Sequence, residues 1–234
     1  CYPQKNTLVY VNSIIPIGAI AACRLSGKRM IVHIHENPHT PKPLYRMLRP
    51  LIRAWVRNSI FVSDYLRRTA ALKGKSYFVY NGLKLNEGIS ESRRVIGKKL
   101  LMVSSLRTAK GIDTFADLAK RMPEYSFTLV LSTTAAEADE WFARAGSPSN
   151  MSVFPLHKEL GMFYSEADLH LQLSKPSMAV ETFGMTIVEA MQYGVPSVVP
   201  CVGGPAEIVR VTGCGIACDT ENVEILERSI RSLL

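Results

Sequence analysis

Short apolar strands alternate with helical segments along almost the whole chain, and this alternation limits the fold more than any other feature. The strands are apolar throughout, as in TLVYVN at 7–12 and KLLMVS at 99–104. Such strands are buried on both faces, and helices between consecutive strands are typical connections of a parallel sheet. The sequence therefore predicts an α/β fold with doubly wound, Rossmann-like parallel sheets.

The alternation runs in two series, separated by a polar stretch. The first series predicts strands at 7–12, 29–35, 58–63 and 77–80, and helices at 17–25, up to 57 and at 64–72, the last one capped by Ser63. The second predicts strands at 99–104, 127–131, 152–155, 169–173, 197–200 and 215–218, and helices at 111–121, 135–145, 158–166, 185–193, 205–211 and 223–234. We expect a partial N-terminal domain at 1–85, a linker at 86–98 and a C-terminal domain at 99–234.

Composition excludes several classes of protein. Hydrophobic residues make up 47% and charged residues 21% of the chain, which is ordinary for a globular protein. No uncharged apolar run reaches the roughly 20 residues of a membrane-spanning helix. The five cysteines form no CxxC pair, which argues against a disulfide framework and favours a cytoplasmic location. The N-terminus has no signal-peptide pattern. The chain begins at Cys1 and not at Met, directly before an apolar strand-like run, so we expect its natural start to be missing.

The net charge of +8 is unevenly distributed. Residues 42–110 hold 16 Lys and Arg against three acidic residues, which gives +13, while the remainder holds 12 against 17, which gives −5. A basic region beside an acidic one indicates two units, the basic one facing an anion. Phosphorylated small molecules, anionic lipid headgroups and nucleic acid are the candidates.

Ligands of parallel sheets bind beyond the carboxyl ends of the strands, so the segments after each strand are the candidate sites. Arg107, Lys110 and Gly111 follow the strand at 99–104. Two cations at a helix N-terminus add to the positive end of the helix dipole and favour an anion. Ordinary solvated charge is the alternative explanation.

A second candidate segment contains two glutamates around a glycine. Glu181 precedes Gly184, and Glu189 follows within the helix expected at 185–193. The backbone amides of Thr182-Phe183-Gly184-Met185-Thr186 then lie at a helix N-terminus, where they can hold a phosphate. Carboxylates beside such a pocket suit the hydroxyl groups of a sugar. The alternative is one carboxylate at a helix N-terminus and one in solvent.

Two further segments also follow strands. Gly203-Gly204-Pro205 allows the backbone to approach a ligand closely, or forms a simple strand-to-helix turn. His35 ends a strand of the first series, where it can face a cleft between domains. The His33-x-His35 spacing can bind a metal, but further ligands at suitable spacing are missing, so we predict no metal site. A purely structural histidine is the other alternative.

Together these segments resemble the family 4 glycosyltransferases, which are retaining nucleotide-sugar enzymes of GT-B fold. The resemblance covers nearly the whole chain, and its residues are Arg107, Lys110-Gly111, the EX7E pair Glu181 and Glu189 around Thr182-Phe183-Gly184, Gly203-Gly204-Pro205-Ala206-Glu207, His35 and Asn81-Gly82. Relatives carry a Gly-rich loop after their first strand and a final crossing helix. Neither has a counterpart here, so we expect a fragment that lacks both ends.

The resemblance implies a role for each matching residue. Arg107 and Lys110 would bind the donor diphosphate and stabilise the charge that builds as the glycosidic bond breaks. Glu189 would hold the ribose hydroxyls, Glu181 the donor sugar near its anomeric centre, and His35 the sugar from the acceptor side. Further donor contacts are expected from Gly111, Thr182, Phe183, Gly184, Met185 and Thr186. Leu156 belongs to the segment Phe154-Pro155-Leu156, which would lie where the base sits in relatives.

The resemblance also implies a reaction and its partners. The chain would transfer a sugar from a UDP- or GDP-linked donor to a hydroxyl acceptor, without a metal or other cofactor. Bacterial cell-surface polysaccharide or glycolipid assembly is the expected setting. The alternatives are a GT-B-fold nucleotide-sugar epimerase, which needs no acceptor, and a nucleotide-binding fragment without activity. A nucleic-acid-binding domain is disfavoured, because most aromatic residues of the basic segment fall at expected core positions.

A basic helix raises the question of membrane contact. Arg46, Arg49, Arg53 and Arg57 follow one another at helical spacing, and Trp55 lies on the same segment. Such a helix is typical of a membrane surface, although a surface helix packed on its sheet fits equally well. In the membrane interpretation the acceptor is lipid-linked, and the protein is peripheral on the inner face of the plasma membrane.

Overall fold

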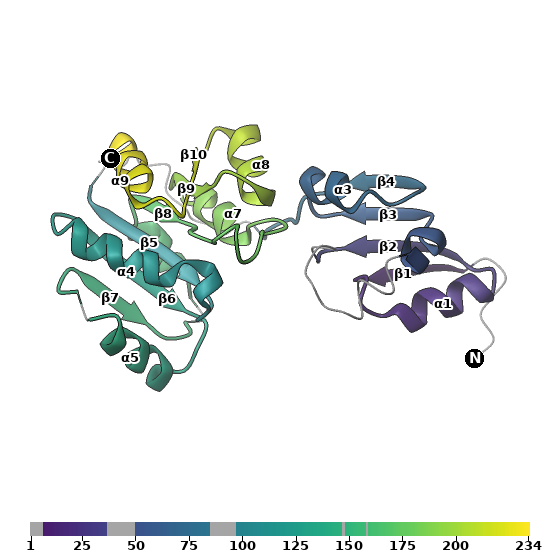
Figure 1. Ribbon diagram of the computed structural model, residues 1–234, viewed down its shortest axis with the longest axis horizontal. Helices are drawn as coiled ribbons and strands as arrows, with labels where there is room; N and C mark the ends of the chain where they lie inside the picture. The colour runs from purple at the N-terminus through teal and green to yellow at the C-terminus, as the bar shows by residue number, and fades with distance from the viewer. Residues whose placement is uncertain (1–6, 37–49, 85–96, 147, 158) are drawn as a thin grey trace. The chain divides into compact units, whose positions relative to one another are not determined.

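The computed structural model describes residues 7–36, 50–84, 97–146, 148–157 and 159–234. The chain divides into two compact units, Cys1–Gly82 and Leu83–Leu234, and each has its own parallel sheet (Figure 1). The predicted α/β class with two Rossmann-like parallel sheets is confirmed. Most of the expected linker lies outside the described residues. Within those residues, no helix is both long and apolar enough to cross a membrane.

The first unit carries a four-stranded sheet in the order β1-β2-β3-β4. Its elements are β1 (Leu8–Asn12), α1 (Ile17–Leu25), β2 (Arg29–Ile34), β3 (Asn58–Phe61), α3 (Asp64–Ala70) and β4 (Lys75–Phe78), with a further helical stretch at 50–55. Val32, Ile34 and Phe61 are fully buried in its core. Ser63 caps α3 as predicted, because its hydroxyl accepts a hydrogen bond from the Leu66 amide at 3.1 Å.

The second unit carries a six-stranded parallel sheet in the order β10-β9-β8-β5-β6-β7. Its strands are β5 (Lys99–Ser104), β6 (Ser126–Leu131), β7 (Met151–Phe154), β8 (Leu169–Leu171), β9 (Ser197–Pro200) and β10 (Gly215–Cys218). Its helices are η1 (Thr108–Lys110), α4 (Ile112–Arg121), α5 (Ala135–Arg144), α6 (Gly161–Glu166), α7 (Met185–Gln192), α8 (Gly203–Thr212) and α9 (Val223–Leu233). The chain builds β5 to β7 toward one edge and then returns to place β8 on the other side of β5. The switch point, where ligands of such sheets bind, therefore lies between β5 and β8.

Strand β5 contributes to a core on each face of this sheet. Leu100 and Met102 belong to a cluster completed by residues of α4, α5 and α9. Leu101 belongs to a second cluster with residues of α6 and α7. Successive residues of a strand point to opposite faces, so the continuous apolar run of β5 fills both cores.

Several element boundaries differ from the predicted ones. Strand β4 covers Lys75–Phe78 and not 77–80, β8 ends at Leu171 and not at 173, and α6 begins at Gly161. β4 is an edge strand of the described sheet, and most of its side chains are exposed. Its position was wrong by two residues because apolar side chains mark a strand only where they are buried.

Candidate active site

Loops after β5, β8 and β9 meet at the carboxyl edge of the second sheet, beside the switch point. The Lys175 amide after β8 donates a hydrogen bond to the Ala109 carbonyl after β5 at 2.9 Å. The Gly204 amide at the start of α8 donates to the Glu181 carbonyl at 3.0 Å. The segments with the predicted donor-side residues therefore contact one another.

Two glycines permit this close approach. Gly111 has φ +76°, and a Cβ there would lie 2.1 Å from the Leu173 carbonyl oxygen. A Cβ on Gly204 would lie 2.4 Å from the Thr182 carbonyl oxygen and 2.5 Å from the Phe183 Cα. No side chain fits either position, so the geometry of the three loops requires glycine at both.

Lys110 and Glu181 form an ion pair that joins the loop after β5 to the loop after β8. Both side chains are about one-third exposed or less, at 32% and 26%. Burial lowers the pKa of the Lys110 ammonium, and the neighbouring Arg107 guanidinium lowers it further. Sequence reasoning brought these residues to one site but missed their direct contact, since 71 positions separate them.

Arg107 stands beside this pair on the exposed side of the loop. It is the N-cap residue of η1, and its backbone is extended. Its side chain is exposed, and among the residues that the structure describes it forms no ion pair with a carboxylate. The loop thus presents one cation to solvent and holds the Lys110 ammonium against Glu181.

Helix α7 points its N-terminus toward the same edge. It begins at Met185 after Gly184, which has φ +130°, and no side chain caps it. Glu181 lies in the preceding loop and Glu189 lies past the first turn, as the sequence predicted. An uncapped helix start carries unsatisfied amides and the positive end of the helix dipole, which together favour an anion.

A buried tyrosine orients Glu189. The Tyr164 hydroxyl, on α6, donates a hydrogen bond to the Glu189 carboxylate at 2.7 Å. The Tyr164 ring is stacked on Tyr193, with centroids 5.8 Å apart. Burial and the Glu189 charge raise the pKa of the Tyr164 phenol well above its usual range, so it remains a donor. No motif in the sequence singles out Tyr164, and sequence reasoning missed it.

The loop that leads to Glu181 is anchored to the segment after β10. The Glu221 carboxylate accepts hydrogen bonds from the Ser177 hydroxyl and, at 3.0 Å, from the Ser177 amide. The buried Thr220 hydroxyl donates to the Ser174 carbonyl at 2.9 Å. These contacts hold the first part of the loop and thereby position the residues that follow it. No motif in the sequence indicates these contacts.

Leu156, the residue predicted to contact the base, follows the edge strand β7 of the second sheet. Leu156 is 69% exposed, and its amide donates to the Thr133 carbonyl at 3.0 Å. Phe154 packs against Phe163 of α6 with the two rings tilted, their centroids 5.0 Å apart. Leu156 is therefore accessible at the carboxyl edge, and its contact with a base stays a prediction.

His35 lies at the carboxyl edge of the first sheet, directly after β2. Its Nε2 lies 2.8 Å from Oδ1 of Asn12, and its ring packs on His33, with centroids 4.2 Å apart. Burial and the neighbouring His35 lower the pKa of His33. The described residues contain no group of three or more His, Cys, Asp or Glu arranged to hold a metal. The placement of His35 against the donor side stays a prediction.

The basic stripe is described only in part. Arg46 and Arg49 lie outside the described residues. Arg53 lies on the helical stretch at 50–55, partly buried, and Arg57 is exposed just before β3. Membrane contact by the four arginines therefore stays a prediction.

Comparison with known proteins then identifies the family. A family model for glycosyl transferases group 1 matches residues 90–234, which is more than half of the chain. The chain belongs to this family. A curated relative is the probable sucrose-phosphate synthase 5 of Oryza sativa subsp. japonica, 40% identical over 55 residues. This match covers 24% of the group 1 chain described here and 5% of the rice protein.

Solved structures show the same fold as this group 1 chain. HepE of Anabaena, in complex with UDP and glucose, gives a TM-score of 0.77 at 21% identity, covering 96% of this chain and 67% of HepE. A glycosyltransferase of Rickettsia africae gives 0.75 at 15% identity, covering 97% and 66%. Sucrose-phosphate synthase of Thermosynechococcus elongatus gives 0.75 at 17% identity, covering 97% and 64%. At these identities the likeness shows the fold alone, which is the predicted GT-B type.

Proposed function

We propose that this chain transfers a sugar from a nucleoside diphosphate sugar to a hydroxyl acceptor. The observation that carries the proposal is the meeting of Lys110, Arg107 and the uncapped start of α7 with Glu181, at the switch point of a parallel sheet. Cations and open amides suit a diphosphate, and the carboxylate beside them suits sugar hydroxyls. Membership of glycosyl transferases group 1 supports the same reaction.

The donor diphosphate would bind by replacing Glu181 as the partner of Lys110. Arg107 and the first amides of α7 complete the positive surroundings of the leaving group. Charge builds on the diphosphate as the glycosidic bond breaks, and donors held in place before the reaction stabilise it without reorganisation. These protein groups account for leaving-group stabilisation, and we propose that the reaction needs no metal.

The two glutamates would take separate parts of the donor. Glu181, released from Lys110, accepts hydrogen bonds from the sugar hydroxyls near the anomeric centre. Glu189, oriented by Tyr164, accepts hydrogen bonds from the ribose hydroxyls. The EX7E resemblance supports retention of the anomeric configuration. HepE was solved with UDP and glucose, which supports UDP over GDP as the donor nucleotide.

The acceptor side of the proposal rests on the first unit. His35 at the end of β2 would contact the donor sugar from that side. A hydroxyl acceptor carried on a lipid, as in bacterial polysaccharide or glycolipid assembly, would match a protein that lies on the inner face of the plasma membrane. The exposed Arg57 and the neighbouring Trp55 support this placement.

Nucleotide binding and turnover test the proposal. We expect one of UDP, GDP, ADP and dTDP to bind, with UDP first. Lys110→Ala and Glu189→Ala should each weaken binding by about 1.5–3 kcal/mol, the range for a hydrogen bond to a charged group. Glu181→Gln should lower kcat more than it weakens nucleotide binding. Isothermal titration calorimetry and a product assay with the matching nucleotide-sugar measure the two effects.

Matched controls separate the site from general charge effects. Lys120→Ala removes an exposed lysine of α4, and Glu140→Gln neutralises an exposed glutamate of α5. Both should leave binding and turnover unchanged. The proposal fails if no nucleotide binds, or if these controls lose as much as the site variants. Conversion of the donor sugar without an acceptor would favour an epimerase instead.

A further inference from the structure

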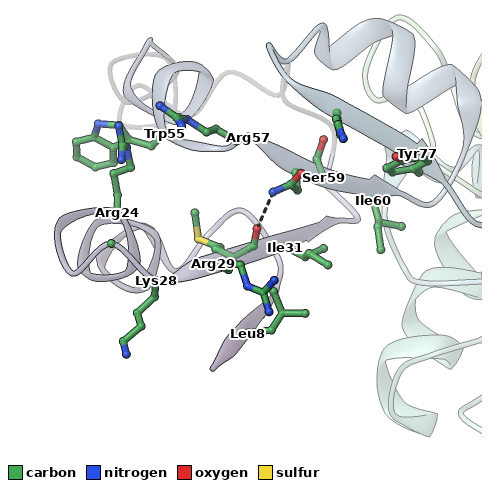
Figure 2. Close-up of a pocket in the computed structure, with 14 residues that line it drawn as sticks. Leu8, Arg24, Lys28, Arg29, Ile31, Trp55, Arg57, Ser59, Ile60 and Tyr77 are labelled. Atoms are coloured by element: carbon green, nitrogen blue, oxygen red, sulfur yellow. Dashed lines mark hydrogen bonds between the residues drawn. The ribbon is translucent and has the colours of Figure 1, made fainter. Parts of the chain in front are cut away.

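A basic cavity lies at the amino edge of the first sheet, opposite to the edge that carries His35. Its volume is about 570 Å³, within the range of small-ligand sites. The first residues of all four strands line it: Leu8, Arg29, Asn58 and Lys75. Figure 2 shows Leu8 and Arg29 at two of these strand starts, together with Arg24 at the end of α1 and with Trp55 and Arg57.

The charge of the cavity has one sign. Among the described residues that line it, five are cations, namely Arg24, Lys28, Arg29, Arg57 and Lys75, and none is an aspartate or glutamate. In the described part of the chain, Arg24, Arg29, Arg57 and Lys75 form no ion pair with a carboxylate. These four like charges repel one another, and a bound anion relieves that repulsion.

Helix ends explain only part of this charge. Arg24 lies in the last turn of α1 and Arg57 follows the helical stretch at 50–55, where cations offset the negative end of the helix dipole. Arg29 and Lys75, however, begin strands. They have no helix end to stabilise, so the dipole does not account for their place in the cavity wall.

The backbone fixes Lys75 beside Arg57. The Lys75 amide donates a hydrogen bond to the Arg57 carbonyl at 2.8 Å. Gly74 has φ +111°, and a Cβ there would lie 2.4 Å from the same carbonyl oxygen. Only glycine at position 74 allows the backbone to approach the Arg57 carbonyl this closely. The approach places the Arg57 and Lys75 side chains at one side of the cavity. Asn58 Nδ2 donates a hydrogen bond to the Met30 carbonyl at 3.5 Å, and both residues line the cavity.

We propose that this cavity binds a phosphate-bearing ligand. A phosphate takes several cations at once, and the planar guanidinium groups of Arg29 and Arg57 bind its oxygens in pairs. The rings of Trp55 and Tyr77, the latter 60% exposed, offer apolar surface to the remainder of the ligand. The ligand is either a soluble phosphate ester or the headgroup of an anionic lipid. The proposal does not depend on the sugar-transfer reaction, because the cavity lies wholly within the first unit.

Trp55 gives a local signal for occupancy of the cavity. The chain contains two tryptophans, and Trp141→Phe leaves Trp55 as the sole one. In that background, titration with inorganic phosphate should change the Trp55 fluorescence in a saturable way. Lys75→Glu and Arg57→Gln should each weaken the apparent affinity by about tenfold or more, the effect of losing a charge-assisted hydrogen bond. Circular dichroism checks that each variant is folded.

Two matched variants serve as controls. Lys73→Glu makes the same charge change two residues from Lys75, and Arg53→Gln removes an arginine four residues from Arg57. Neither residue lines the cavity, so both variants should keep the affinity of the parent protein. Equal losses in controls and cavity variants would overturn the proposal. So would the absence of a saturable change in fluorescence, if vesicle binding also does not depend on Lys75. Lys110→Ala should leave the signal unchanged, which separates this site from the donor site.

Vesicle flotation distinguishes the two sources of phosphate. Vesicles of phosphatidylcholine alone are compared with vesicles that also contain phosphatidic acid. Flotation with phosphatidic acid that is lost in Lys75→Glu and kept in Lys73→Glu assigns the cavity to a lipid headgroup. A fluorescence response to inorganic phosphate without flotation assigns it to a soluble ligand. Flotation that survives Lys75→Glu and Arg57→Gln, together with no response to phosphate, would refute the proposal.

Discussion

At the scale of residues, the Lys110–Glu181 ion pair changes how the site works. A lysine held by a neighbouring carboxylate is less attractive to an incoming anion than an unpaired one. If the proposed function is correct, a diphosphate displaces Glu181 from Lys110. That exchange would leave the carboxylate without its partner when the donor sugar binds. One contact thus links diphosphate binding to the availability of the group proposed to hold the sugar.

Tyr164→Phe tests whether Glu189 must be oriented. The variant removes the hydroxyl that donates to the carboxylate at 2.7 Å and keeps the stacked ring. We expect KM for the nucleotide-sugar to rise about fivefold, or roughly 1 kcal/mol, with kcat little changed, because ribose contacts act in binding. Tyr125→Phe, which alters a buried tyrosine of the other core cluster, should leave KM unchanged. A fall in kcat alone would contradict this role.

His170 predicts how stability depends on pH. It is fully buried in β8, its Nδ1 lies 3.0 Å from the Ser197 hydroxyl, and burial lowers its pKa to about 3. The unfolded chain binds a proton near the ordinary pKa of about 6.5, so the unfolded state gains protons first. The contribution of His170 to the free energy of unfolding should be complete above that pH. It should fall as the pH decreases toward 3, by at most about 1.4 kcal/mol per pH unit.

Urea denaturation at several pH values between about 7.5 and 5 measures the effect. His170→Gln should lower stability at neutral pH and flatten the pH dependence relative to the parent protein. An unchanged slope would show that His170 does not titrate differently in the two states.

The sequence identified some site residues and not others for a physical reason. Lys110, Glu181 and Glu189 lie within short segments whose spacing is characteristic, so a single sequence was enough to predict a role for them. Tyr164 and Glu221 act through contacts with Glu189 and Ser177, 25 and 44 positions away. Such contacts depend on how distant segments pack in three dimensions, so the spacing of residues within one segment does not predict them.

At the scale of elements, sequence patterns located strands well where both faces are buried. Strands β5 and β9 have the predicted bounds, because each contains a continuous run of buried residues. The edge strand β4 was misplaced, since its position is set by the Gly74–Arg57 contact and not by buried side chains. The bounds of an exposed edge strand therefore cannot be predicted from its own residues without knowing which segments it contacts.

Gly204→Ala tests the packing of α8 against the loop that carries Glu181. The new methyl group would lie 2.4 Å from the Thr182 carbonyl oxygen, so the loop or the helix must move. We expect a loss of about 1–3 kcal/mol of stability, as for other overpacked sites, and weaker nucleotide binding. Urea denaturation and calorimetry measure the two changes.

Gly18→Ala is the matched control for this substitution. Gly18 lies in α1, and a Cβ there would meet no atom within 4 Å. Alanine should stabilise that helix slightly or leave it unchanged, because glycine is the weaker helix former. If both variants lose stability equally, the close approach at Gly204 is not the cause of its effect.

At the scale of the whole molecule, each unit has its own sheet and its own core, so a ligand can stabilise one without the other. With UDP present, amide hydrogen exchange should slow in the donor-side segments, such as η1 and the first turns of α7. The amides of β2 in the first unit should exchange at the same rate with and without UDP. At a UDP concentration of 100 times Kd, the stabilisation should reach about 2.7 kcal/mol.

Exchange followed by mass spectrometry resolves these segments. Lys110→Ala should abolish the slowing at the same UDP concentration, while Lys120→Ala should keep it. Equal slowing in β2 and in α7 would contradict the assignment of the nucleotide to the second unit.

The common direction of β1 to β4 places the two proposed sites of the first unit at opposite edges of its sheet. A strand of six residues, such as β2, places its ends roughly 17–20 Å apart. A phosphate group seated next to Arg29 is therefore far beyond hydrogen-bonding reach of His35, although the two residues are close neighbours in the chain. Any influence of such an occupant on sugar transfer would have to be transmitted through the protein, as allostery and not as direct participation.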